Sequence, residues 1–147
     1  MKTIKIVDDG KKKTSELLAD CGDYWCYLFD EELDNQFPPV KSSRTFNLTQ
    51  EPDVLGVSAR ESDPKTRGIT LRERLLLESA YFKEKGEHLD VKSWTICSGS
   101  RDSDGSVPYV CWYPYDRKVY VSRFDVDDAS PRDGLRSAIS LEPSPPV

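Results

Sequence analysis

The sequence predicts an α+β fold in which one main helix packs on a three-stranded antiparallel β-meander. Two observations carry this prediction: the apolar, well-capped segment Leu71–Lys85, and three later segments in which apolar side chains alternate with others. The strand segments cover residues 93–98, Val107–Tyr113 and Lys118–Phe124. The short connections between them favour antiparallel hairpins, and a helix across one face would give the small sheet a core.

Length, composition and charge limit the classes of protein to consider. The chain has 147 residues, 37% hydrophobic and 32% charged, with a net charge of −5. This length suits one domain, and the negative balance argues against a strongly basic nucleic-acid-binding surface as the first expectation. No apolar run reaches the length of a membrane span, and the amino terminus lacks the apolar core of a signal peptide. We therefore expect a cytoplasmic protein without a membrane partner.

The first 39 residues form an acidic and aromatic segment that we expect to pack on the core. Residues 3–7 alternate in polarity, which predicts an edge strand. Thr14 or Ser15 then caps a short helix over residues 16–21, and Gly22 ends it.

An aromatic run follows at residues 24–29. It is too apolar to remain in water and too short for its periodicity to separate helix from strand; we interpret it as a strand. Asp30 is placed to cap a second short helix over residues 31–37, which Pro38 stops.

Polar segments flank the core unit, which we assign to residues 68–141. Residues 40–67 lack a convincing pattern, and we predict a mobile connection with one extended piece near residues 44–48. After the meander, Pro131 at a first helical position predicts a short C-terminal helix. Residues 142–147 are expected to form a disordered tail.

The main helix has clear start and stop signals. Thr70 and Glu73 match a capping box, in which the threonine oxygen accepts a free amide and the glutamate reaches back to the cap. Leu71 and Phe82 lie on one apolar stripe that further leucines widen to both sides. Lysines in the last turn and Gly86 give the usual helix end.

The four cysteines raise the alternative of a zinc-stabilised domain. They are Cys21, Cys26, Cys97 and Cys111. Neither pair has the C-x2-C spacing of a recognisable zinc knuckle, but the last two would lie close together across the first hairpin. Buried, unreactive thiols are the competing interpretation, and we predict no cofactor and no metal from these spacings.

Two loops and two single residues offer weaker chemical hypotheses. Residues 102–106 resemble part of a calcium loop, but a hairpin turn in which aspartates accept local amides explains them equally. Residues 98–101 could form an amide nest for an anion. His88, the only histidine, could join a cysteine as a base, although a surface role is the simpler interpretation. Glu78 lies on the apolar stripe, where an ion pair with Arg74 is favoured over a functional acid.

The sequence favours a small, non-enzymatic interaction protein, because no catalytic or cofactor motif emerges. Charge is segregated: residues 14–39 carry seven acidic and no basic side chains, and residues 91–124 are mildly basic. Such asymmetry favours a partner protein with a basic surface. The candidate interaction residues are Tyr24, Trp25, Glu31, Glu32, Asp34, Arg101, Tyr109, Trp112, Arg117 and Arg123.

The alternative function is binding of single-stranded nucleic acid through the meander. Its aromatic rings can stack on bases, while Arg101, Arg117 and Arg123 can meet phosphates. Such a platform needs several rings exposed on one face. Strand alternation places Trp112 opposite Tyr109, so about half of the rings can share a face.

Overall fold

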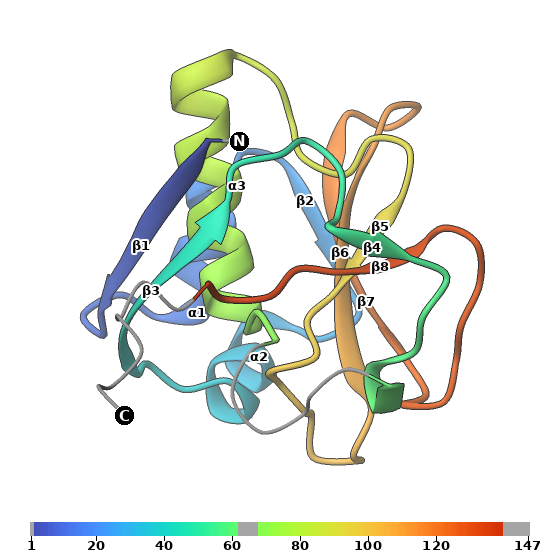
Figure 1. Ribbon diagram of the computed structural model, residues 1–147. Coiled ribbons are helices and arrows are strands. Elements are labelled where there is room, and N and C mark those ends of the chain that lie inside the picture. The colour runs from blue at the N-terminus through green and yellow to red at the C-terminus, as the bar shows by residue number, and fades with distance from the viewer. Residues whose placement is uncertain (1, 62–67, 140–147) are drawn as a thin grey trace, which may run out of the picture.

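The structure, a computed structural model, describes residues 2–61 and 68–139 (Figure 1). In those ranges no helix is long and apolar enough to cross a membrane. The elements, in chain order, are β1 (Thr3–Asp9), α1 (Thr14–Asp20), β2 (Tyr24–Cys26), α2 (Asp30–Gln36), β3 (Lys41–Asn47), β4 (Val54–Leu55), the 3₁₀ helix η1 (Ala59–Glu61), α3 (Leu71–Lys85), β5 (Trp94–Ile96), β6 (Val107–Tyr113), β7 (Lys118–Phe124) and β8 (Asp133–Leu135).

The predicted main helix, α3, is confirmed with its caps. The N–H of Glu73 donates to Thr70 Oγ1 (3.1 Å), and the N–H of Thr70 donates to Glu73 Oε1 (2.9 Å). Gly86 ends the helix at a φ of +69°, a left-handed conformation that glycine adopts without strain. The capping signals at both ends of this element therefore lie in its local sequence.

The predicted meander is confirmed, but it is the centre of a larger sheet. β5 pairs antiparallel with β6, and β6 pairs antiparallel with β7. β5 is shorter than the predicted segment. The whole sheet has six strands in the order β2-β7-β6-β5-β8-β4. Because β2 runs parallel to β7 and β8 runs parallel to β5, the sheet is mixed.

The predicted C-terminal helix is wrong, because its residues form β8. Gly134 lies so close to β4 and the residues before it that a Cβ atom on it would be 2.4 Å from Pro52 Cβ and 2.9 Å from Leu55 Cδ2. The neighbouring Arg136 is 1% exposed and donates to the carbonyls of Thr49 (2.8 Å) and Gln50 (3.0 Å). Tertiary contacts thus override the local helix signal. Residues 140–147, which include the predicted tail, lie outside the described residues.

The expectation that residues 40–67 hold only one short extended piece is also wrong where the structure describes them. β3 pairs antiparallel with β1 over its full length, from Thr3 opposite Asn47 to Asp9 opposite Lys41. β4 and η1 follow in the same stretch. The mobility of this connection stays a prediction, and residues 62–67 lie outside the described residues.

The short N-terminal elements largely follow the prediction. α1 begins at Thr14, two residues earlier than expected, and the aromatic run forms a strand only over Tyr24–Cys26. Asp30 is the first residue of α2 and does not cap it; the cap position is held by Phe29, without a side-chain hydrogen bond. Asp30 accepts instead from the Tyr24 hydroxyl (3.1 Å).

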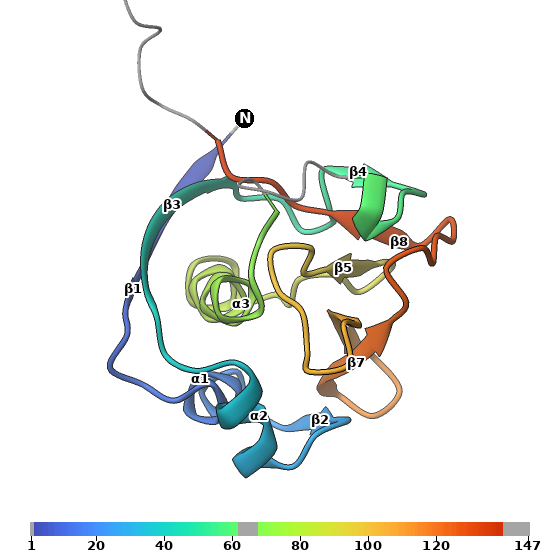
Figure 2. The same ribbon diagram turned by 90° about the horizontal axis from the view of Figure 1, so that it is seen from below.

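α3 lies between the two sheets, with the β1–β3 pair curving along one side and the six-stranded sheet on the other (Figure 2). Its leucines pack with the inward side chains of β6 and β7 in the main core. A smaller cluster lies on the outer face of the sheet, where Val57 and Ala59 pack on Ile96, Val107 and Leu135. The segment around η1 therefore covers part of that outer face.

Candidate interaction surfaces

The four cysteines do not form a metal centre. Within residues 2–61 and 68–139, no group of three or more His, Cys, Asp or Glu side chains is placed to hold a metal ion. Cys21 Sγ donates to the carbonyls of Leu17 (3.3 Å) and Leu75 (3.4 Å). Burial raises the pKa of Cys97 and of Cys111 to about 12. These contacts and raised pKa values favour the interpretation as unreactive thiols over a zinc site.

Four buried charged side chains join α3 to the sheet. Arg74 donates from Nε to Asp90 Oδ2 (3.0 Å) and from Nη1 to Glu78 Oε2 (3.1 Å). Arg136 donates from Nη2 to Asp90 Oδ1 (2.7 Å). Each of these four residues is at most 1% exposed. The predicted ion pair between Arg74 and Glu78 is confirmed.

Within this group, the contacts of Arg74 and Glu78 favour their charged forms. Burial acts to raise the pKa of Glu78, but contacts with His88, Arg74 and the N–H of Leu89 outweigh it, so this pKa lies below its ordinary value. Burial acts to lower the pKa of Arg74, and the carboxylates of Asp90 and Glu78 raise it above the ordinary value. All four carboxylate oxygens have partners inside the fold, which favours a structural role.

His88 is part of the same network and not of a thiol pair. Its Nδ1 lies 2.8 Å from Glu78 Oε1. Its ring stacks between Phe82, with ring centroids 4.7 Å apart, and Trp112, with ring centroids 4.3 Å apart. The structure therefore does not assemble the cysteine–histidine pair that the sequence allowed.

The loop before β6 is a hairpin turn stabilised by one aspartate. Asp102 Oδ1 accepts from the N–H groups of Asp104 and Ser106, both at 2.9 Å, and Oδ2 accepts from the Tyr27 hydroxyl (3.0 Å). Gly105 supplies the positive φ of +83° that the turn requires. These contacts occupy the oxygens of Asp102, in agreement with the turn interpretation and not with a calcium loop.

The loop at residues 98–101 completes the start of α3. Ser100 Oγ accepts from the N–H of Leu71 (3.0 Å). Arg101 donates from Nη1 to the carbonyls of Ser98 (2.8 Å) and Ser100 (2.7 Å). The serine and arginine predicted for an anion nest are thus used to close the loop itself.

Some of the predicted acidic and aromatic residues make hydrogen bonds within the fold, and others are exposed to solvent. Asp34 accepts from the N–H and the hydroxyl of Ser15, both at 2.7 Å, and so ties α2 to α1. The half-buried Tyr24 donates to Asp30, and its burial, followed by the Asp30 contact, raises its pKa. In contrast, Glu31 and Glu32 are exposed.

Two aromatic rings of the same segment, residues 23–32, are exposed. Trp25 is 46% exposed, and Phe29, in the connection between β2 and α2, is 87% exposed. The expectation that this aromatic run leaves water is thus wrong for Phe29, and Trp25 is exposed as a candidate interaction residue would be. We call the group formed by Trp25, Phe29, Asp30, Glu31 and Glu32 the acidic aromatic surface.

A second set of rings lies on the face of the sheet opposite α3. Ring centroids are 5.5 Å apart for Trp25 and Tyr120, and 5.1 Å apart for Tyr113 and Tyr120. A separate group of Trp94, Tyr109 and Phe124 has centroids 4.2 to 5.8 Å apart. We call the set the aromatic sheet face; its rings are those of Trp25, Trp94, Tyr109, Tyr113, Tyr120 and Phe124.

The other predicted nucleic-acid contacts do not gather at this face. Trp112 packs against the core on the opposite side, as alternation predicts. Arg123 also leaves β7 on the α3 side; it donates to Asp104 (2.8 Å) and lies over the Tyr27 ring at 5.6 Å. Arg117 and Arg123 are exposed and Arg101 is half-buried. Arg123 and Arg101 donate to groups within the fold, whereas Arg117 lies in the turn that joins β6 to β7.

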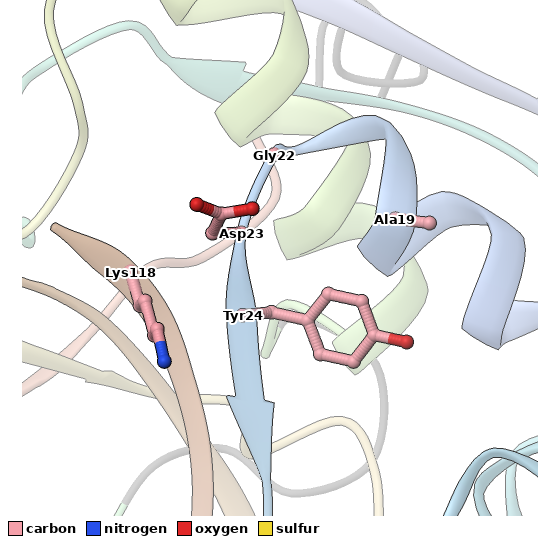
Figure 3. Close-up of a pocket in the computed structure, with 5 residues that line it drawn as sticks. All are labelled: Ala19, Gly22, Asp23, Tyr24 and Lys118. Carbon is pink, nitrogen blue, oxygen red and sulfur yellow. The ribbon is translucent and has the colours of Figure 1, made fainter. Parts of the chain in front are cut away.

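A pocket of about 400 Å³ lies where α1, β2 and β7 meet (Figure 3). Asp23 and Tyr24 leave the chain on opposite sides, and Lys118 extends from β7 beside them. Ala19 and Gly22 complete the lining. The pocket borders β2, the strand at one edge of the sheet.

No family model, no curated protein and no solved structure matches this chain significantly.

Proposed function

We propose that this chain is a non-enzymatic binding protein whose acidic aromatic surface docks a partner protein with a basic surface. The observation that carries the proposal is the exposure of Trp25 and Phe29 in the same short segment as the exposed Glu31 and Glu32. An exposed apolar patch rimmed by polar residues often marks a protein interaction site. Aromatic anchors inside a charged rim are the usual arrangement of a protein interface.

The charge of the surrounding segment supports a cationic partner. Residues 14–39 include seven acidic side chains and no basic one. Arginine and lysine gain from both features, because their cations pair with carboxylates and lie favourably over aromatic rings, at about 0.5–1 kcal/mol for an exposed contact. A field of one sign also accelerates encounter with an oppositely charged partner.

Affinity capture from the native host, followed by titration with the recovered partner, tests the proposal. The double variant Trp25→Ala/Phe29→Ala should lower the affinity by at least about tenfold, since anchor residues contribute about 2 kcal/mol or more. Glu31→Lys should lower the association rate, and the effect should shrink with added salt. Glu87→Lys, at an exposed carboxylate near the end of α3, is the matched control and should leave binding unchanged. Equal affinity of Glu31→Lys and Glu87→Lys contradicts the proposal.

A second candidate function is binding of single-stranded nucleic acid on the aromatic sheet face. The grouping of Trp25, Tyr113 and Tyr120 on one face favours it, with Arg117 and Lys118 at the border. The net charge of −5 weighs against it. Titration with a deoxythymidine oligonucleotide at low salt is the test, and binding should weaken with a salt slope of about 0.7 per phosphate contact. Tyr113→Ala should cost about 1–3 kcal/mol of binding without unfolding the protein. Absence of binding at low salt removes this candidate.

A further inference from the structure

One edge of the six-stranded sheet is unpaired in the described chain. The sheet ends at β2, which pairs only with β7. The carbonyl of Asp23 accepts from the N–H of Val119 (3.0 Å), and the N–H of Tyr27 donates to the carbonyl of Val121 (3.0 Å). Because the backbone groups of a parallel strand turn to alternate sides, Tyr24 and Cys26 direct theirs away from β7. These groups are available to another strand.

Space is available at this edge. The pocket of about 400 Å³ borders it and is lined by the small residues Ala19 and Gly22 together with Tyr24. A Cβ atom on Gly22 would meet nothing within 4 Å, so the backbone there can be approached closely. In Figure 3 this pocket opens beside the start of β2.

The charge at the edge selects the occupant. Asp23 is exposed at the start of β2, and Asp30, Glu31 and Glu32 follow its end. Lys118 is the only cation among the residues that line the pocket. A second copy of this chain would bring like charges together across a β2–β2 pair, which is unfavourable. A segment with alternating basic side chains fits the edge instead.

We infer that β2 accepts an extended basic segment of the partner protein as an added strand. The inference rests on the proposed function, for which it supplies the binding mode. Main-chain hydrogen bonds to Tyr24 and Cys26 hold the segment, as in other cases of strand addition. Side chains on one face of the segment then lie beside Trp25, where a cation meets an aromatic ring. Side chains on the opposite face lie beside Tyr24 and the pocket.

The test uses the full ¹⁵N-labelled chain and a synthetic peptide of alternating lysine and valine, monitored by amide chemical shifts. Two further peptides carry N-methyl groups, one on every lysine amide and one on every valine amide. In a peptide that pairs with β2, only alternate residues direct their N–H groups toward β2, so either the lysine amides or the valine amides donate hydrogen bonds to it. One methylated peptide should therefore bind at least about tenfold more weakly than the unmodified peptide, while the other binds normally. Shifts should centre on Tyr24 and Cys26.

Two variants separate this inference from the proposed function. Ala19→Trp fills the pocket from an exposed position and should weaken binding of the unmodified peptide about tenfold, with unchanged thermal unfolding. Glu31→Lys should weaken binding through charge alone. Equal binding of both methylated peptides, with sensitivity to Glu31→Lys retained, overturns strand addition but keeps the proposed function. Absence of binding by any of the peptides at millimolar concentration overturns both. Self-association through β2 at the same concentration, seen by sedimentation, also overturns the inference.

Discussion

At the scale of single residues, Asp90 connects the largest number of buried charges. It accepts from Arg74, from Arg136 and from the Thr95 hydroxyl, and its backbone has a φ of +53°. A buried ion pair adds little net stability when it is complete, because desolvation offsets the attraction. Its removal is costly, because a charge is then left without a partner. Loss of one member of the network should therefore destabilise the fold more than the complete network stabilises it.

The first prediction concerns Asp90→Asn, which keeps the shape and tolerates the left-handed backbone. It leaves two buried guanidinium groups facing a neutral amide, and the free energy of unfolding should fall by about 3–5 kcal/mol. Urea denaturation measures this difference. Glu87→Gln, on an exposed carboxylate, is the control and should unfold at the wild-type urea concentration. An Asp90→Asn midpoint equal to that of the control contradicts the prediction.

The second prediction follows from the depressed pKa of Glu78. An acid whose pKa is lower in the folded state than its ordinary value of 4.5 stabilises the fold above that pH. The stabilisation is lost as the pH falls through the folded pKa. Wild-type stability should therefore decline on acidification below about 4.5, and Glu78→Gln should show a smaller decline over the same range. Urea denaturation at a series of pH values makes the comparison; parallel curves would show that Glu78 does not carry this dependence.

The sequence identified some site residues and missed others for a physical reason. Glu78 lies four residues from Arg74, so helix spacing alone predicts their pairing. Asp90 and Arg136 are 46 residues apart, and nothing local joins them. Asp34, predicted as an open interaction residue, binds Ser15 on another helix. Contacts between distant elements decide which polar residues remain free, and a single sequence does not contain them.

At the scale of elements, the ends of α3 are determined by local signals, whereas β8 is determined by contacts with distant parts of the chain. α3 has its caps within its own sequence and was predictable to the residue. β8 has helix-like local signals but is held as a strand by Arg136 and by the approach of Gly134 to Pro52. β3 was predicted only in part, as an extended piece near residues 44–48, because its first residues include serines and a lysine that resemble a loop, while β1 supplies its pairing.

The third prediction tests β8 with Gly134→Ala. In a helix this change would stabilise the protein by about 1 kcal/mol. In the strand, the added Cβ atom would be 2.4 Å from Pro52 Cβ and 2.9 Å from Leu55 Cδ2, so the chain must shift. The free energy of unfolding should fall by about 1–3 kcal/mol, the usual cost of overpacking. Thermal or urea unfolding gives the sign, and a stabilised variant would contradict the strand.

At the scale of the whole molecule, charged contacts fasten the two sheets to the helix between them. Arg72 donates to Asp8 of β1 from Nε (2.7 Å) and Nη2 (2.9 Å). Arg44 of β3 donates from Nε to Glu73 (2.8 Å). Arg74 makes the corresponding link toward the six-stranded sheet through Asp90. α3 is thus the element whose loss would release both sides of the fold.

The fourth prediction is a pattern of amide exchange. The paired amides of α3, β6 and β7 should exchange slowest, because they open only with the whole fold. Amides of residues 48–61 should exchange fastest among the described core, since β4 has only two residues. Hydrogen exchange followed by NMR measures this directly. If the amides of β3 exchange as fast as those of residues 48–61, the β1–β3 pair is a separate, weaker unit.

Alkylation of the four cysteines can report where and in what order the folded chain unfolds locally. Burial raises the pKa of Cys21 and Cys97 to about 12 and that of Cys26 to about 11, so almost no thiolate exists in the folded protein at neutral pH. An alkylating reagent should therefore modify these residues only when the surrounding structure opens. The order in which mass spectrometry detects the modified peptides would then give the order of opening, with Cys21 and Cys26 reporting on the N-terminal segment and Cys97 and Cys111 on the sheet.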